Sequence, residues 1–493
     1  MSTVPALAVS RTSTDKSAGT LKRERQKRSF LTALALAFLL FGGSIWTALE
    51  AVSAASALES ESFGALTLQG LYFSLAILLR HMRRPVSLFE PYTMVTLVYV
   101  LVYHVAPVFQ FSLGNSARYG VDAMPQTVEA VALVMAGHFF FTLAYGFVGR
   151  KKSQGSLPSI YREPIDKSRL TKIAYIAFVV CYVLAVYYQI GRGFSLAYVM
   201  TGGLTGEQSG TGTVGESSLM FLSYFRYACV GAWAVAFAYG QNRVAKVVSF
   251  VMLLAIVFFS GTRAAILLPI LVPIVIHYIQ KGGAPSLVSL GIAAGLLVLL
   301  FAVMQVTRGG VAAGSGFDIG GSSVDDLFSP FYAEIDDFKV FYSILGVVPE
   351  RHDFLYGSQM ILYSLILLVP RAIWPGKPMP QVYDIVNATY GNQAVLDGVA
   401  YPNLGEYYVE FGAIGVVVCM FVLGLLCRYA RNLYVKRQGL SLSLVFYSLI
   451  YGALFQIIIR GYMPQNFTMM LFLLAPVVLV AIVNKRSLRT LEH

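Results

Sequence analysis

Residues 369–378 read VPRAIWPGKP, and they lie inside 306–410, the one long stretch that resembles neither a membrane span nor a basic tail. The stretch contains Arg371, Lys377 and a group of acids, whereas the sequence on both sides is strongly apolar. We therefore predict that apolar helices frame this stretch at one membrane face, and that it carries the chemistry of the protein.

The composition outside this stretch is that of a polytopic membrane protein. Of the 493 residues, 57% are hydrophobic and only 13% are charged, and the mean hydropathy is +0.66. Soluble domains average about 25% charged residues, so no soluble domain of ordinary size fits the sequence. The cysteines all lie in apolar runs, which argues against external disulfides and metal sites. They are Cys181, Cys229, Cys419 and Cys427.

Runs of about 20 apolar residues predict an all-α bundle of about twelve membrane spans. Residues 30–304 form the N-terminal part of the predicted bundle, 305–410 a large external loop, and 411–490 the C-terminal spans. Residues 1–29 read as a disordered basic tail and 491–493 as the scar of an affinity tag. The predicted spans are 30–49, 63–80, 88–111, 127–149, 170–190, 218–239, 245–260, 263–280, 285–304, 411–428, 441–459 and 466–484.

The basic residues support this topology. With both termini in the cytoplasm, most of the 37 Lys and Arg fall in cytoplasmic segments and most of the 25 acids fall outside, as the positive-inside rule requires. The net charge of +12 is thus explained by orientation and by contact with anionic lipids rather than by nucleic acid. A further crossing at 355–374 would invert the charge pattern after it, so we interpret this apolar segment as an interfacial helix.

Six cations outside the predicted cytoplasmic segments are candidate ligands for a phosphate or pyrophosphate. Arginine suits this role because it keeps its charge and presents a bidentate fork. A cation inside a span, such as Arg226, costs at least a few kcal/mol and usually faces a polar cavity. The alternative is that each cation snorkels to headgroups or pairs with an acid. The six are Arg226, Arg263, Arg308, Arg371, Lys377 and Arg460.

Acids and aromatic residues of the loop complete the candidate site. Glu406 and Asp336 are candidate general bases that would take a proton from an attacking hydroxyl, and the alternative is that they cap helices or form ion pairs. External histidine is almost absent, so the sequence predicts no metal site and a metal-independent mechanism. Aromatic residues offer flat faces for sugar rings, and the candidates are Trp374, Tyr407 and Tyr408, with Tyr332, Tyr356, Tyr383 and Tyr401 as further examples.

Three motifs in this frame support a family resemblance. SGTR at 260–263 stands at the outer tip of a predicted helical hairpin, and the late external loop contains PRAIWPGKP at 370–378 and GEYYVEFG at 405–412. This combination resembles the Wzy-type O-antigen and oligosaccharide repeat-unit polymerases of bacterial envelopes, over most of the chain after about residue 170. The resemblance implies a fold similar to the GT-C superfamily, in the inner membrane, with a periplasmic active site.

The resemblance also implies a reaction. Such enzymes join oligosaccharide units carried on undecaprenyl pyrophosphate, and the growing chain leaves its carrier for a hydroxyl of the incoming unit. Arg371 and the other cations would then stabilise the pyrophosphate leaving group, and Glu406 or Asp336 would act as the base. We expect no cofactor; the expected partners are the lipid-linked oligosaccharide, membrane lipids and a chain-length regulator protein.

Two rival functions stay open at this point. An O-antigen ligase would share the turn and the loop, but it would transfer finished chains to the lipid A core. A transporter of lipid-linked saccharides is the rival from another class. Transporters often show internal repeats and broken helices at the midplane, and the sequence shows neither.

Overall fold

The computed structural model describes most of the chain, in two compact units, Met1–Leu88 and Phe89–His493. The described residues are 33–83, 87–147, 166–191, 220–258, 263–281, 285–286, 289, 292, 295, 336–371, 373–396, 399, 401–435 and 442–489. The predicted tail 1–29, the scar 491–493 and Arg308 therefore lie outside them.

The first unit is an apolar helical hairpin of the helix Ala33–Ser53 and α2 (Ala57–Arg83). Polar groups tie the hairpin together at two points. The Oγ1 atoms of Thr47 and Thr67 lie 2.9 Å apart. At the start of α2, Ser56 Oγ accepts the N–H of Glu59 and Glu59 Oε2 accepts the N–H of Ala55, an arrangement close to a capping box.

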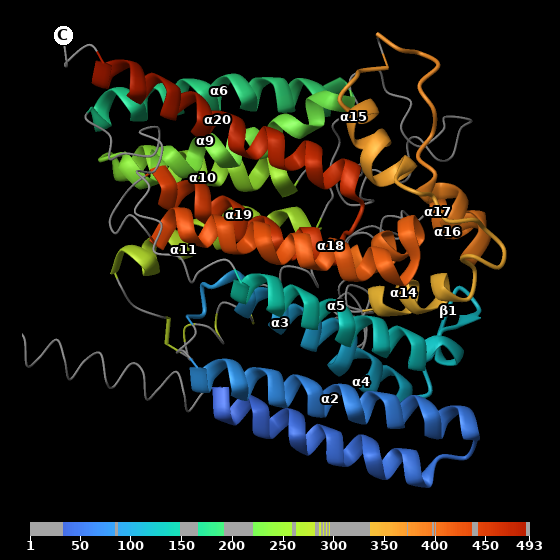
Figure 1. Cartoon of the computed structure of the whole chain (residues 1–493). Coiled ribbons are helices and arrows are strands. Elements are labelled where there is room, and N and C mark those ends of the chain that lie inside the picture. Colours follow the sequence, from blue (N-terminus) through green and yellow to red (C-terminus); the bar gives the residue numbers. More distant parts are fainter. Residues whose placement is uncertain are drawn as a thin grey trace, which may run out of the picture. The chain divides into compact units, whose positions relative to one another are not determined.

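The second unit is a helical bundle with a two-stranded hairpin at one end (Figure 1). The chain first forms one long helical segment, Pro91–Ser112, which contains a π-helical turn at Leu101–Val105. The elements in order are α3 (Pro91–Val100), α4 (Ala106–Ser112), β1 (Ala117–Arg118), β2 (Val121–Asp122), α5 (Thr127–Phe147), α6 (Lys167–Gly191), a 3-10 turn (Met220–Tyr224), α9 (Phe225–Tyr239), α10 (Arg243–Phe258), α11 (Arg263–Lys281), α14 (Asp337–Leu345), a π-helical turn (Ser358–Tyr363), α15 (Ser364–Leu367), α16 (Val382–Tyr390), α17 (Asn392–Leu396), α18 (Asn403–Val435), α19 (Leu442–Ile459) and α20 (Met463–Arg489).

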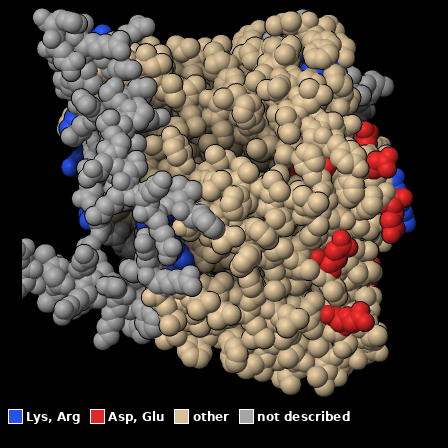
Figure 2. All heavy atoms as spheres, viewed as in Figure 1, with Lys and Arg blue, Asp and Glu red and all other residues tan. Residues whose placement is uncertain are grey.

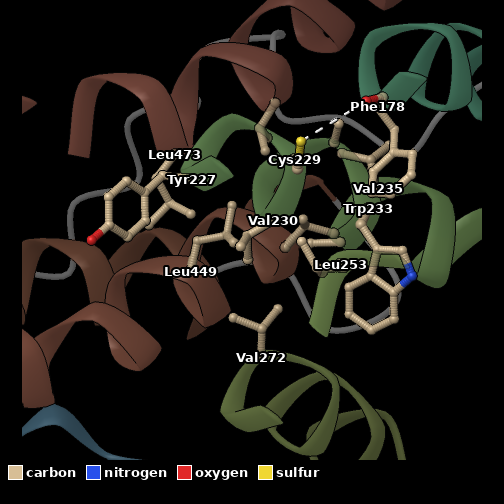
Figure 3. Close-up of a cluster of buried hydrophobic side chains, with 14 of the residues drawn as sticks. Phe178, Tyr227, Cys229, Val230, Trp233, Val235, Leu253, Val272, Leu449 and Leu473 are labelled. Carbon is tan, nitrogen blue, oxygen red and sulfur yellow. Dashed lines mark hydrogen bonds between the residues drawn. The ribbon is translucent and has the colours of Figure 1, made fainter. Parts of the chain in front are cut away.

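Helix α9 is at the centre of the core. It packs against α6, α10, α11, α19 and α20, and its residues Arg226 to Ala236 are all buried. Figure 3 shows Val230 of α9 between Leu449 of α19 and Leu253 of α10. A helix that is apolar on every face fits only where other helices or lipid surround it. Gly231 allows the closest approach, because a Cβ there would lie 2.0 Å from the carbonyl oxygen of Leu473.

Helix α18 is broken near its start. Phe411 and Gly412 leave the helical conformation, and Gly412 has a φ of 64°, which glycine adopts without steric cost. The break separates a short N-terminal segment, residues 403–410, from the long part that packs along α5. The predicted span 411–428 begins at this break, although the helix itself begins eight residues earlier, at Asn403.

The predicted fold class is confirmed, because the described part of the chain is a polytopic helical bundle with almost no strands. Among the described residues, nine helices are long and apolar enough to cross a membrane. They correspond to nine of the twelve predicted spans. Two further predicted spans, 245–260 and 263–280, coincide with α10 and α11, which have 16 and 19 residues. The span 285–304 lies largely outside the described residues, so the total of twelve stays a prediction.

The segment 355–374 forms a helix too short to be a span. Its π-helical turn has six residues and α15 has four, so together they extend about 15 Å, half of a hydrocarbon core of about 30 Å. We refer to residues 358–367 as the loop helix. Its length agrees with the prediction that this segment does not add a crossing.

The close contact at Gly231 leads to a prediction for stability. Gly231→Ala should destabilise the protein by about 1–3 kcal/mol, because the new methyl group would force α9 away from α20. Gly146→Ala in α5 is the matched control, since a Cβ there meets nothing within 4 Å. Thermal unfolding of the purified protein in detergent would measure both. Equal unfolding temperatures for the two variants would contradict the prediction.

Candidate functional site

Several segments that are distant in sequence meet at one end of the second unit, which we call the loop end. Helices α14 to α17, the β-hairpin and the start of α18 all lie there (Figure 1). Figure 2 shows the visible acidic side chains mostly on the right of the view and most visible basic side chains on the left. The charge separation in the structure thus follows the one read from the sequence. The N-terminus of α20 also belongs to the loop end, because Glu406 of α18 contacts Met463.

Arg226 is a buried cation with no carboxylate partner in the part of the chain that the structure describes. It lies in the first turn of α9 and is 8% exposed. Its guanidinium group donates to Tyr227 Oη at 3.3 Å and lies 4.8 Å from the centroid of the Tyr227 ring, while Nε has no hydrogen-bond partner. Among the described residues no carboxylate pairs with it. A buried charge is costly unless it is paired, so this position suits an anionic ligand.

Several tyrosines lie between Arg226 and the turn that contains Arg371. Burial raises the pKa of Tyr462 well above its usual value, and the neighbouring groups of Tyr363, Tyr383, Tyr224 and Glu406 raise it further. Burial likewise raises the pKa of Tyr383 to about 12, with Tyr363 adding to the shift and the Arg371 cation opposing it. Tyr224 in turn lies within electrostatic range of both Arg226 and Tyr383, so these residues form a continuous set. We call Arg226, Tyr224, Tyr363, Tyr383 and Tyr462 the arginine–tyrosine cluster.

Arg371 and Lys377 close the turn that follows the loop helix. Arg371 Nη1 donates to the carbonyl oxygen of Lys377 at 2.8 Å. Lys377 Nζ donates to the carbonyl oxygens of Leu367 (3.2 Å) and Val369 (3.1 Å), so its charge meets the negative end of the loop helix. Burial and the Arg371 cation lower the pKa of Lys377 to about 8. The two predicted phosphate ligands are thus together, and loop carbonyls hold both.

Glu406 and Glu410 hold two other helices in place from the start of α18. Both carboxylates are fully buried. Glu406 Oε2 accepts the N–H of Met463 at 2.6 Å, at the N-terminus of α20. Glu410 accepts the N–H groups of Gly357 and Met360, each at 2.6 Å, at the N-terminus of the loop helix. A carboxylate at a helix N-terminus accepts hydrogen bonds from free N–H groups and interacts favourably with the positive end of the helix dipole.

Glu406 also retains capacity for chemistry. Its second oxygen, Oε1, is buried and finds no hydrogen-bond partner among the described residues. A carboxylate oxygen of this kind can accept a proton from a polar ligand. Asp336 differs, because it lies 3.3 Å from the buried Lys339 Nζ in an ion pair, and its carbonyl oxygen accepts from Arg118. Asp336 also has one oxygen, Oδ1, without a hydrogen-bond partner among the described residues. The two candidate bases therefore differ in charge pairing: Asp336 pairs with Lys339, whereas Glu406 has no ion-pair partner among the described residues.

The remaining predicted site residues are three cations and three aromatic residues. Arg460 lies at the end of α19, two residues before Tyr462 of the cluster, whereas the side chain of Arg263 and the whole of Arg308 lie outside the described residues. Trp374 is 42% exposed, but Tyr407 and Tyr408 are only 5% and 6% exposed. In this conformation Trp374 alone of the three presents a ring to a sugar, and their role in stacking stays a prediction.

Sequence reasoning missed Glu410 and the role of the cluster tyrosines as neighbours of Arg226. One signal for Glu410 was available: it stands four residues after Glu406 in an apolar segment, which places both carboxylates on one side of a helix. The cluster tyrosines had no such signal, because Tyr224, Tyr363, Tyr383 and Tyr462 come from four separate parts of the chain. Only the tertiary fold brings them together.

The fold and this end of the bundle define a multi-pass membrane protein with a buried cationic site at its loop end. The chain belongs to the O-antigen polysaccharide polymerase Wzy family, whose model matches residues 31–489, nearly the whole chain. Membership confirms the resemblance and makes the protein a membrane-bound polymerase of the glycosyltransferase type. No curated protein and no solved structure matches the chain.

The cap that Glu410 of α18 forms on the loop helix gives a first test of the site. Glu410→Gln should remove a charged acceptor and place an amide N–H₂ against backbone N–H groups, at a cost of about 2 kcal/mol. Hydrogen exchange at Gly357 and Met360 should then accelerate about thirtyfold, and mass spectrometry would measure it. Glu350→Gln, at an exposed position, is the control. Unchanged exchange in Glu410→Gln would contradict the capping role.

Lys377 gives a test by pH. Because its pKa is lowered to about 8, the neutral and reactive amine should predominate above pH 8 rather than above about 10.4, the ordinary value for lysine. Labelling with an amine reagent, read at this residue by mass spectrometry, should show a midpoint near pH 8. Arg371→Gln should move the midpoint upward, since the Arg371 cation lowers this pKa. A midpoint near 10 in the wild-type protein would refute the assignment.

Proposed function

We propose that the protein polymerises oligosaccharide repeat units carried on undecaprenyl pyrophosphate, at the periplasmic face of the bacterial inner membrane. The family supports a polymerase that acts on lipid-linked repeat units in membranes, and the nine apolar helices support a multi-pass protein. The proposal adds the carrier lipid, the membrane face and cytoplasmic termini. It assigns 30–304 and 411–490 to the transmembrane frame, and 305–410 to the external loop.

The observation that carries the proposal is Arg226. It is a buried guanidinium group with no carboxylate partner among the described residues, next to tyrosines that lead to Arg371 and Lys377. A pyrophosphate would supply the missing negative charge. Arg226 would bind it most directly, and Arg371, Lys377, Arg460, Arg263 and Arg308 are the further proposed ligands.

The proposed reaction forms one glycosidic bond and breaks one sugar–phosphate bond. A hydroxyl of the incoming unit attacks the anomeric carbon of the growing chain, and the pyrophosphate leaves on its lipid. Negative charge grows on the leaving oxygen, which fixed cations stabilise in a site of low dielectric constant. The hydroxyl proton passes to a base, and we assign that role to Glu406 through its unpartnered Oε1, with Asp336 as the alternative.

The proposed mechanism uses no metal and no cofactor, because cations of the chain can take the role that a divalent ion has in other phosphate-dependent transferases. Membrane lipids surround the protein, and a chain-length regulator is the proposed protein partner. Activity that disappears with a chelator and returns with Mg²⁺ or Mn²⁺ would contradict the metal-independent reaction.

Arg226→Ala should abolish long polysaccharide ladders in a complemented deletion strain, while the amount of protein in the membrane stays unchanged. Loss of a buried ligand for the leaving group should reduce the rate by at least about a hundredfold. Purified protein with a synthetic lipid-linked repeat unit, with and without chelator, would measure this directly. Arg351→Ala is the control, since Arg351 is an exposed arginine of the segment 305–410.

Two outcomes would contradict the proposal. Normal ladders in the Arg226→Ala strain would remove the assignment of the pyrophosphate site. Unmodified lipid A core together with intact lipid-linked polymer in the deletion strain would indicate a ligase instead of a polymerase.

A further inference from the structure

Two exposed tyrosines share a backbone conformation that tyrosine rarely adopts. Tyr119 and Tyr356 have φ angles of 48° and 47°, and in the part of the chain that the structure describes they are the only residues other than glycine with positive φ. Their side chains are 41% and 74% exposed. Strained residues of this kind persist where the surrounding structure imposes them, and they concentrate at functional sites.

Both tyrosines occupy the same place in the same kind of turn. Tyr119 and Gly120 form the two-residue connection between β1 and β2, in which Arg118 pairs with Val121. Tyr356 and Gly357 form the corresponding pair of a turn closed by the Ser358 N–H and the Leu355 carbonyl oxygen at 3.0 Å. Both central residues have positive φ, the pattern of a type I′ turn, which strongly prefers Asn-Gly. The turn therefore does not select tyrosine.

Groups other than the two rings anchor both turns. The hairpin is fixed by Arg118, which lies 3.5 Å from Asp337 Oδ1, and by Lys339 Nζ, which donates to the Ala117 carbonyl oxygen. The second turn is fixed by Glu410, whose carbonyl oxygen accepts the Tyr356 N–H at 2.9 Å and whose carboxylate accepts the Gly357 N–H. The rings are thus additions to turns that backbone and charged groups already hold.

Each ring contacts an aromatic neighbour among the described residues. The Tyr119 ring lies 5.7 Å from that of Tyr390, at an angle of 50°, and the Tyr356 ring meets that of Phe354 edge to face at 6.1 Å. These contacts restrict the rings while much of their surface stays open to solvent. Beside Tyr390, Asn387 and Asn392 are exposed, and their amides can donate and accept hydrogen bonds.

We propose that Tyr119 and Tyr356 are stacking platforms for the sugar rings of the growing polysaccharide, at the loop end. A tyrosine ring has a large apolar face of partial negative charge, which suits the C–H face of a pyranose. It also loses little conformational entropy on binding, because it has only two side-chain torsions. A chain of several sugars is the ligand that can use two rings on separate turns. The inference rests on the proposed function for the presence of a saccharide.

Asparagine and phenylalanine variants separate the ring from the turn. In Tyr119→Asn, Tyr356→Asn and the double variant, the turn gains its preferred residue and loses the ring; Tyr119→Phe and Tyr356→Phe keep both the ring and the strain. The probe is the soluble saccharide released by mild acid from the polysaccharide of the source strain. Its affinity for the full-length protein in lipid nanodiscs is measured by saturation-transfer NMR.

Each asparagine variant should bind the fragments about threefold to tenfold more weakly, the size of one aromatic contact, and the double variant should lose more than either. The phenylalanine variants should stay within about twofold of the wild type, since the ring face remains. Unfolding temperatures of the asparagine variants should equal or exceed that of the wild type, because the strain is relieved.

Three results would overturn the inference. They are unchanged affinity in the double asparagine variant, an equal loss in the phenylalanine variants, and a lower unfolding temperature of the asparagine variants, which would make the rings structural. If the asparagine variants kept their fragment affinity but no longer bound a chain-length regulator, the rings would belong to a protein interface. This result too would contradict the inference. The binding assay contains no lipid-linked donor, so fragment binding can fail although the wild-type protein polymerises, and polymerisation can fail although the fragments bind. Failure of this inference is therefore distinguishable from failure of the proposed function.

Discussion

Two buried carboxylates, one helical turn apart, determine how the loop end is assembled. Glu406 caps the N-terminus of α20, and Glu410 caps the N-terminus of the loop helix. Both side chains come from the eight residues before the break in α18. Hydrogen bonds to a charged acceptor contribute about 1.5–3 kcal/mol each, and more is lost when one partner is left buried alone. The turn with Arg371 and Lys377 follows the loop helix directly, so its position depends on the same two groups.

Three ion pairs of the described residues contrast with the surroundings of Arg226. Glu90 pairs with Arg431 at 2.6 Å, and Asp336 and Asp337 pair with Lys339 and Arg118. In these places the chain supplies the counter-charge that an apolar interior demands. Among the described residues, Arg226 has the ring and the hydroxyl of Tyr227 instead, which disperse the charge without neutralising it. That contrast, more than the number of cations, is the reason why we propose an anionic ligand at this position.

Sequence periodicity was sufficient to predict a polytopic helical bundle but not the site. Apolar runs predict spans because backbone groups in lipid must be satisfied within a helix, and the start predicted at 411 coincides with the break at Phe411 and Gly412. Helix capping by Glu406 was one of the alternatives read from the sequence, but the helix that it caps was not predictable, since its partner Met463 is 57 residues away. The hairpin tip at Tyr119 was missed because tyrosine gives no sign of a left-handed turn.

The break in α18 limits what can change in its first segment. Successive residues of a helix are rotated by about 100°, so one inserted or deleted residue between Glu406 and Glu410 would turn one carboxylate away from its helix. A residue added at the break would instead rotate the segment 403–410 against the long part that packs on α5. Length in this segment is therefore constrained more tightly than residue type, and variation in related chains should appear there as substitution rather than as insertion.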